Sequence, residues 1–281
     1  MSARSAVSDA ALERWDCHVH VFEAQAPVQA GHYQPADAPL QTLQSTASAL
    51  GVNRLVLVQP SVYGHDHQVM LRALARAPGQ HRGVAVLPPD ISDTPWDELH
   101  AAGVRGTRFN LVSPVGHAGP PWADLARLAP GLRARGWHVQ WYARAEDLPR
   151  LAQAQEETKL RFVLDHMAGL QAHHLHQEPL WQALAALASR GAWVKLSGWY
   201  RLGSVFPYTD LYPVALRVHQ LFGRRCLWGS DWPHTSFAPG TAPTYADLVH
   251  PVQAALGETA MSPLWGANAR SLYLDESSPY V

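Results

Sequence analysis

Short apolar runs alternate with helical stretches along the whole chain. Runs rich in β-branched and aromatic residues predict strands. They lie at residues 14–20, 54–59, 83–87, 104–111, 137–142, 160–165, 193–197 and 225–230. Several are almost entirely apolar, which is typical of strands that are covered on both faces. The intervening segments have helical periodicity, and most end at a glycine or proline. They predict helices over residues 40–50, 66–77, 96–102, 122–135, 145–157, 179–190, 211–222, 245–256 and 262–273.

This alternation predicts an α/β fold with parallel strands and right-handed crossovers. Eight such units close into a (β/α)8 barrel, the TIM barrel, here expected as one domain over residues 1–281. An open doubly wound sheet usually has a glycine-rich turn after its first strand. This chain continues instead as His20-Val21-Phe22-Glu23, so the barrel is favoured. The irregular residues 23–39 are expected to cover its mouth.

Composition narrows the classes of partner. The chain has 281 residues, 47% of them hydrophobic and 16% charged, so a large core is available. Its formal net charge of -1 argues against nucleic acid binding. No apolar run approaches the roughly 20 residues of a membrane span, and the first residues do not resemble a signal peptide. Cys17 and Cys226 lie in apolar runs, which predicts no disulfide and a reducing, cytoplasmic location. Homo-oligomer formation is left open.

Two polar stretches lie at the first and last predicted strands. The first is Trp15-Asp16-Cys17-His18-Val19-His20, in which both histidines point to one face because side chains alternate along a strand. An H-x-H triplet taken alone is a weak signal and favours a pair of structural histidines. The second stretch, Trp228-Gly229-Ser230-Asp231-Trp232-Pro233-His234, delivers an acid at the end of the eighth strand. A closed barrel places that strand beside the first one.

Polar side chains follow nearly every predicted strand, and the carboxyl ends of barrel strands are where active sites lie. Structural roles compete with chemical ones: Arg108 could close an ion pair, Lys195 could pair with an acid at mid-strand, and His234 could brace Asp231. The pattern as a whole nevertheless indicates an enzyme. The strand-end residues are His18, His20, Ser61, Arg108, Asn110, Tyr142, Arg144, Asp165, His166, Lys195, Ser197, Tyr200, Arg201, Asp231 and His234.

Three motifs in order resemble the amidohydrolase superfamily, amidohydrolase family 2. They are Asp16-Cys-His18-Val-His20-Val-Phe22, Asp165-His166-Met167 and Gly229-Ser230-Asp231-Trp232-Pro233-His234. Within that superfamily the chain is similar to the lactonase branch that includes 2-pyrone-4,6-dicarboxylate lactonase. Tyr33, Arg108 and Tyr142 agree with the same branch, and Arg201 matches its substrate arginine.

The resemblance implies a hydrolase that opens a lactone with a water activated by Asp231. It also implies that His18, His20 and His166 polarise or protonate the carbonyl. The expected substrate is a small anionic lactone. The residues expected to bind it are Tyr33, Ser61, Arg108, Tyr142, Tyr200 and Arg201.

Two departures bear on the substrate. The dicarboxylate lactonase has basic residues where this chain has Val112-Ser113-Pro114 and Ala168-Gly169-Leu170. Fewer cations weaken the expectation of a substrate with two carboxylates. A muconolactone with one negative charge and a sugar lactone therefore remain alternatives to a 2-pyrone-4,6-dicarboxylate-like compound.

Metal dependence and reaction class also have alternatives. Metal-dependent members carry a bridging lysine or acid on strand four and a histidine on strand five, where this chain has Arg108-Phe109-Asn110 and Tyr142. We expect no required cofactor, although a single divalent ion such as zinc on His18, His20 and Asp231 is chemically reasonable. Two other functions are compatible with the sequence. One is a metal-dependent aromatic-acid decarboxylase of the same superfamily, and the other is a non-catalytic barrel that binds a small ligand.

Overall fold

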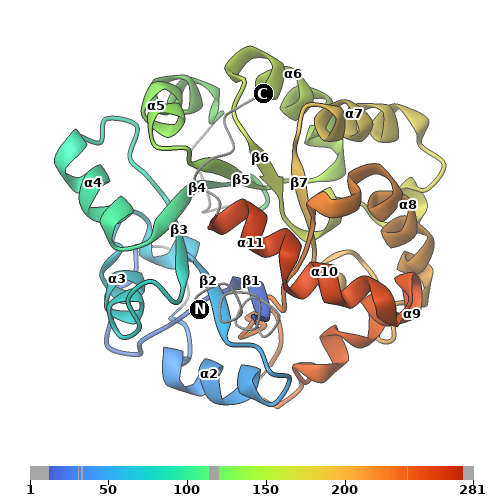
Figure 1. Ribbon diagram of the computed structural model, residues 1–281, viewed down its shortest axis with the longest axis horizontal. Coiled ribbons are helices and arrows are strands. Elements are labelled where there is room, and N and C mark those ends of the chain that lie inside the picture. The colour runs from blue at the N-terminus through green and yellow to red at the C-terminus, as the bar shows by residue number, and fades with distance from the viewer. Residues whose placement is uncertain (1–12, 31, 33, 114–119, 239, 275–281) are drawn as a thin grey trace, which may run out of the picture.

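The computed structural model describes residues 13–30, 32, 34–113, 120–238 and 240–274. Eight parallel strands form one sheet in chain order, and in Figure 1 they make a ring surrounded by helices. The predicted (β/α)8 barrel is confirmed. Its strands are β1 (Trp15–Val19), β2 (Arg54–Val58), β3 (Arg82–Ala85), β4 (Val104–Asn110), β5 (His138–Tyr142), β6 (Phe162–Leu164), β7 (Trp193–Leu196) and β8 (Cys226–Trp228).

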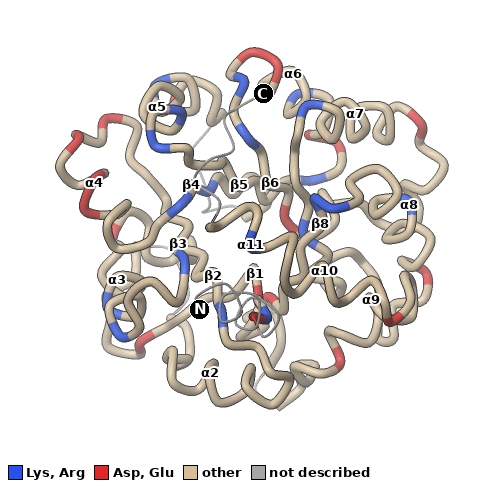
Figure 2. The backbone as a smooth tube through the Cα atoms, in the orientation of Figure 1, with Lys and Arg blue, Asp and Glu red and all other residues tan. Residues whose placement is uncertain are grey.

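The helices follow the predicted order, and α2 to α9 surround the ring of strands in Figure 1. They are α2 (Leu40–Ser48), α3 (Gln68–Ala75), α4 (Asp93–Ala101), α5 (Trp122–Ala134), α6 (Leu148–Thr158), α7 (Glu178–Ser189), α8 (Tyr212–Phe222), α9 (His250–Leu256), α10 (Met261–Trp265) and α11 (Ala267–Tyr273). None of them, within the described ranges, is both long enough and apolar enough to span a membrane. In Figure 2 most charged residues lie on the outer helices and loops, and a few reach the strands, including β4.

Alternation along the strands separates an apolar layer from a polar one. On β4, Phe109 belongs to the apolar core and stacks on Trp141 of β5 with ring centroids 4.8 Å apart. The neighbouring Arg108 and Asn110 instead bond to polar partners. The period of two therefore directs the polar side chains of these strands into the barrel and the aromatic ones toward the helices.

The barrel closes where β8 meets β1, just beyond the short last strand. Val19 and Trp232 form an isolated parallel bridge. The backbone N–H of His20 donates to the carbonyl oxygen of Trp232 at 2.8 Å, and that of Asp231 donates to the carbonyl oxygen of His18 at 2.9 Å. These backbone bonds place Asp231 beside the two histidines.

The buried carboxylate of Asp16 joins the same two strands from below. Its Oδ1 accepts the backbone N–H of Ser230 at 2.9 Å and that of His18 at 3.1 Å, while its Oδ2 accepts the Tyr245 hydroxyl. Burial raises the pKa of Asp16 to about 6, although these hydrogen bonds act in the opposite direction. One side chain thus connects β1, the end of β8 and the segment that follows it.

Helix α11 lies across the amino-terminal end of the barrel, which faces the viewer in Figure 1. Tyr273 stacks on Trp15, the first residue of β1, with ring centroids 5.8 Å apart. Arg82, the first residue of β3, donates its Nε–H to the carbonyl oxygen of Tyr273 at 3.1 Å. Access to the barrel interior is therefore from the carboxyl ends of the strands.

The two closing helices differ from the prediction. The helix predicted over residues 262–273 is broken at Gly266, whose φ of -126° and ψ of -90° lie outside the helical region. The helix predicted over residues 245–256 begins only at His250, after the 3-10 turn Ala246–Leu248, with Pro251 in its first turn. Apolar periodicity runs through both breaks, so the pattern alone did not reveal them.

A packing test of the barrel interior is Gly106→Ala. A Cβ at Gly106 would lie 2.6 Å from the imidazole of His138 and 2.8 Å from its carbonyl oxygen. Because a fixed backbone atom cannot move aside easily, we expect the variant to lose about 1–3 kcal/mol of unfolding free energy, the usual cost of overpacking. Equilibrium urea unfolding measures this loss, and a variant as stable as the parent would contradict the packing described here.

Candidate active site

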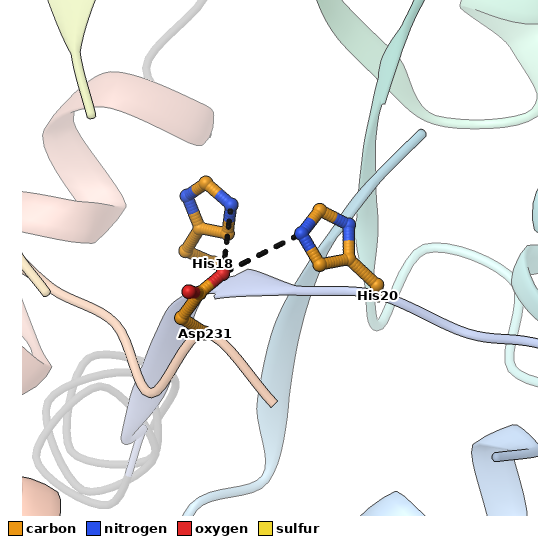
Figure 3. Close-up of side chains that lie close together, drawn as sticks. All are labelled: His18, His20 and Asp231. Atoms are coloured by element: carbon orange, nitrogen blue, oxygen red, sulfur yellow. Dashed lines mark ion pairs between the residues drawn. The ribbon is translucent and has the colours of Figure 1, made fainter. Parts of the chain in front are cut away.

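Two histidines of β1 face the carboxylate that follows β8. His18 Nε2 and His20 Nε2 each lie 3.5 Å from Asp231 Oδ1, as Figure 3 shows. His18 is fully buried, and His20 is nearly so. Gly229 permits this approach, because a Cβ there would lie 2.7 Å from the Cβ of His18. The predicted meeting of the first and last strands therefore occurs at the carboxyl end of the barrel.

A third imidazole comes from the end of β6. His166 begins a run of left-handed residues that continues through Gly169, so the chain turns sharply after the strand. Its ring packs on Gly198, where a Cβ would come within 2.3 Å of Nδ1, and this nitrogen lies 3.0 Å from Ser197 Oγ. The other nitrogen, Nε2, lies 3.9 Å from Asp231 Oδ2. Burial lowers the pKa of His166 to about 4 despite Asp231, so the ring is neutral at pH 7.

The two oxygens of Asp231 have different surroundings. Oδ2 accepts the Tyr200 hydroxyl at 2.6 Å and the Nε–H of Arg201. Oδ1 faces His18 and His20 and has no hydrogen-bond partner in the described part of the chain. Burial by itself would raise the pKa of Asp231, but the positive charge of Arg201, and to a smaller extent the interaction with His166, outweighs burial and holds that pKa well below its usual range. Asp231 is thus an ionised carboxylate with one oxygen directed at the histidines.

A second buried carboxylate, Asp165, lies beneath the histidines. Its Oδ2 accepts Arg108 Nε–H at 3.3 Å and Gln140 Nε2–H at 3.1 Å. Its Oδ1 lies 3.2 Å from His18 Nδ1 and 3.4 Å from Lys195 Nζ. Burial would raise the pKa of Asp165, but His18, Lys195 and Arg108 together hold it well below its usual range. The buried charges are therefore paired, as a stable interior requires.

A cavity of about 400 Å³ opens above these groups, within the range of small-molecule sites. Among the predicted residues, Tyr200 and His18 lie behind Asp231 rather than on the cavity wall, and Tyr33 lies outside the described residues. The lining residues are His20, Phe22, His32, Pro60, Ser61, Val62, Arg108, Asn110, Ser113, Tyr142, His166, Arg201, Asp231, Thr235 and Ser236.

Arg201 has a contact that the sequence did not suggest. It was expected to hold the substrate, and it does line the cavity, but its Nε–H is engaged by Asp231 and its Nη1 donates to Ser236 Oγ at 3.0 Å. Gln140 was missed altogether. Its place on β5, two residues before Tyr142 and on the same face of the strand, is the signal that could have found it.

Among the residues that the structure describes, two groups of side chains have donor atoms close enough to hold a metal ion. One is His18, His20 and Asp231, and the other is His18, Asp165 and His166, with the atoms of each group within 4.8 Å of one another. In the first group His20 Nδ1 lies 2.8 Å from the carbonyl oxygen of Val58. A carbonyl only accepts, so Nδ1 carries a proton, and the tautomer with this single ring proton presents the lone pair of Nε2 toward Asp231. The imidazole and carboxylate donors suit a divalent ion such as zinc.

Fold and site together define a (β/α)8 barrel with an acid–imidazole centre at the carboxyl ends of its strands. The family model described as Amidohydrolase matches residues 15–274. The chain therefore belongs to the amidohydrolase family, as the three motifs predicted.

Relatives of assigned activity are similar over most of their length. A 2-pyrone-4,6-dicarboxylate hydrolase of Comamonas testosteroni is 34% identical over 78% of this chain and 76% of its own. A 4-sulfomuconolactone hydrolase of Rhizobium radiobacter is 30% identical over 88% and 86%.

Two crystal structures are also similar. A candidate 2-pyrone-4,6-dicarboxylic acid hydrolase from Pseudomonas putida has a TM-score of 0.83 and 32% identity, covering 93% of this chain and 97% of its own. A second protein assigned in this way, from Acinetobacter baumannii and with citric acid bound, has a TM-score of 0.80 and 26% identity, covering 92% and 98%.

The ionisation of Asp231 can be tested with Arg201→Met, which keeps the bulk of the side chain and removes its charge. Without the guanidinium, burial dominates and the pKa of Asp231 should rise. Carboxylate ¹³C NMR titration, assigned with Asp231→Asn, should show no titration of Asp231 between pH 5 and 7 in the parent and a clear upward shift in Arg201→Met. An unchanged pKa in the variant would show that Arg201 does not control the acid.

Proposed function

We propose that the protein hydrolyses a lactone that carries an anionic group, with Asp231 as the general base. The observation that carries this proposal is the ionised carboxylate of Asp231 on the wall of a cavity, with Oδ2 held by Tyr200 and Arg201 and with Oδ1 unbonded by any residue that the structure describes. Lactone hydrolysis needs a proton acceptor near the attacking water and cationic or hydrogen-bonding groups near the carbonyl. The names of the bacterial relatives, which act on lactones, support the same reaction class.

The chemistry follows from the placement of the groups. Asp231 Oδ1 takes a proton from water as the water oxygen bonds to the lactone carbonyl carbon. His20 Nε2, 3.5 Å from the same Asp231 oxygen, accepts a hydrogen bond from the second hydrogen of that water, which stays on the water oxygen. The bond between the carbonyl carbon and the ring oxygen then breaks, and Asp231 returns its proton to the leaving alkoxide. The product is the ring-opened hydroxy acid.

Arg108 is the proposed anion site. Its Nε–H is engaged by Asp165, its guanidinium lies over the ring of Tyr142 at 5.4 Å, and the side chain lines the cavity. A guanidinium held in this way offers its remaining N–H groups as a fork that matches a carboxylate. The carboxylate and sulfonate groups in the relatives' named substrates, and the citric acid bound to the Acinetobacter protein, are consistent with this assignment.

A metal ion fits the same centre by position. His18 Nε2, His20 Nε2 and Asp231 Oδ1 would hold it, and the unpartnered atoms of His18 and Asp231 support that fit. A divalent ion there would act as a Lewis acid toward the lactone carbonyl. The residue roles given above do not require the ion.

Substitution of the general base is the main test. Asp231→Asn keeps an oxygen that accepts from Tyr200 and Arg201 but cannot take a proton. We expect kcat for the best substrate of a lactone panel, followed with a pH indicator, to fall about 10²–10⁴-fold. Near-UV circular dichroism should show the fold retained. Turnover close to that of the parent would refute Asp231 as the base and leave a histidine in that role.

The panel also separates the alternatives. Release of carbon dioxide from an aromatic acid without ring opening would favour a decarboxylase. Ligand binding that persists in Asp231→Asn, with no turnover by either protein, would favour a non-catalytic binding barrel.

The anion site is tested by Arg108→Met. Loss of a charge-assisted hydrogen bond worth about 1.5–3 kcal/mol should raise KM for an anionic lactone about 10–100-fold. The KM for a neutral lactone of the same ring size should change little, since it has no group for the guanidinium to hold. Equal effects on the two lactones would assign Arg108 to the carbonyl or to the structure, not to the substrate anion.

A further inference from the structure

Lys195 is a buried charge that the proposed reaction does not use. It lies within β7, its side chain has an exposed fraction of 0%, and it is not part of the cavity wall. Its Nζ donates to Gln140 Oε1 at 2.6 Å. The same ammonium lies 3.4 Å from His18 Nδ1 in hydrogen-bond geometry. Burying a lysine is costly, so its contacts inside the barrel call for an explanation.

Gln140 fixes the orientation of this group. Its Nε2 donates to Asp165 Oδ2 at 3.1 Å, which turns its Oε1 toward Lys195. An ammonium only donates hydrogen bonds, and the amide oxygen is a good acceptor. Lys195 is therefore held with another N–H directed at the imidazole of His18.

The proton on the His18 ring has two candidate positions. Asp165 Oδ1 lies 3.2 Å from His18 Nδ1, and its negative charge favours a proton on that nitrogen. The two atoms do not have hydrogen-bond geometry, however, because Oδ1 has no hydrogen-bond partner among the residues described. A proton on Nδ1 would therefore not point at this oxygen. Lys195 has the required geometry and makes Nδ1 an acceptor. The ring proton then lies on Nε2, 3.5 Å from Asp231 Oδ1.

His20 is constrained in the opposite sense. Its Nδ1 lies 2.8 Å from the carbonyl oxygen of Val58, which only accepts, so its proton lies on Nδ1. We propose that the two histidines of the H-x-H pair are locked in opposite tautomers, and that Lys195 is the positioning residue that sets the tautomer of His18.

This assignment rests in part on the proposed function, because it gives the two rings separate tasks around Asp231. His18 Nε2–H, 3.5 Å from Oδ1, stabilises the negative charge of that oxygen electrostatically, whereas His20 Nε2 accepts a hydrogen bond from the attacking water. It also bears on metal binding, since a nitrogen that carries a proton offers no lone pair. Only two of the three atoms that could hold an ion, those of His20 and Asp231, are then ready to bind one.

The tautomers can be measured without any substrate. The full chain, labelled with ¹⁵N-histidine and treated with chelator, is examined at pH 7 by long-range ¹H–¹⁵N correlation, with signals assigned from His18→Gln and His20→Gln. We expect His18 to be protonated on Nε2 and His20 on Nδ1. Finding both rings protonated on Nδ1 would overturn the proposal, even if the lactone assays succeed. If the lactone assays fail, the tautomers measured for His18 and His20 are still valid.

Lys195→Met tests the cause. It keeps the length of the side chain and removes the donor, so the His18 proton should move to Nδ1, next to Asp165. The matched control is Thr107→Val, an isosteric change at a buried residue of β4 outside this network, which should leave both tautomers unchanged. A His18 tautomer unaltered in Lys195→Met would refute the role of Lys195. If that variant does not fold, the parent spectrum still decides the tautomers.

Metal affinity provides an independent readout. Once His18 Nε2 has a free lone pair, the site has three donors, so Lys195→Met should bind Zn²⁺ more tightly than the parent. Outer-sphere partners typically change affinity on the order of 10–100-fold. Isothermal titration with Zn²⁺ after chelation compares the two proteins and the Thr107→Val control. Equal affinities for the parent and Lys195→Met would contradict the proposed proton on Nε2.

Discussion

The site depends on the connection between the first and last strands, which Asp16 maintains. β8 is one of the two shortest strands, with three residues, and it reaches β1 through one isolated bridge and two flanking backbone hydrogen bonds. Asp16 adds two further bonds across the same junction, to Ser230 and Tyr245, and a third within β1, to the backbone N–H of His18. Since the position of Asp231 relative to His18 and His20 is set by this junction, the reactive geometry follows from barrel closure and not from a mobile loop.

Beneath the cavity the barrel contains a layer of paired charges in addition to its apolar clusters, the smaller of which includes Val56, Val84 and Leu227. Arg108 and Lys195 surround Asp165, and Arg201 holds Asp231. Pairs of this kind contribute little net stability, because desolvation offsets most of the Coulombic attraction, yet removal of one partner is costly. These ion pairs instead keep the carboxylates of Asp165 and Asp231 ionised and orient one oxygen of each toward the histidines. The hydrophobic contribution to folding stability comes from the smaller apolar cluster and from the larger layer between strands and helices, which includes Trp141 and Phe109.

The sequence predicted the barrel well because its signals are local. Apolar runs indicate where each strand and helix lies, and the glycines that follow the helices indicate where they end. Because the carboxyl ends of all strands in a barrel lie on one face, His20, His166 and Asp231 could be predicted to lie together from the sequence alone. The engagement of Arg201 by Asp231 and the place of Gln140 depend on side chains meeting across the barrel, which no local pattern encodes. The break at Gly266 was hidden for a related reason, since apolar positions continue through it.

The position of α11 has a consequence for the order of events in a catalytic cycle. This helix lies across the amino-terminal end of the barrel, so a ligand enters and leaves by the same opening. In the proposed hydrolysis the ring-opened product has one carboxylate more than the lactone, and it forms beside Arg108 and Arg201. The groups that attract the substrate therefore retain the product more strongly, and each molecule must depart before the next can enter. Turnover in such a pocket is governed by release as much as by bond cleavage.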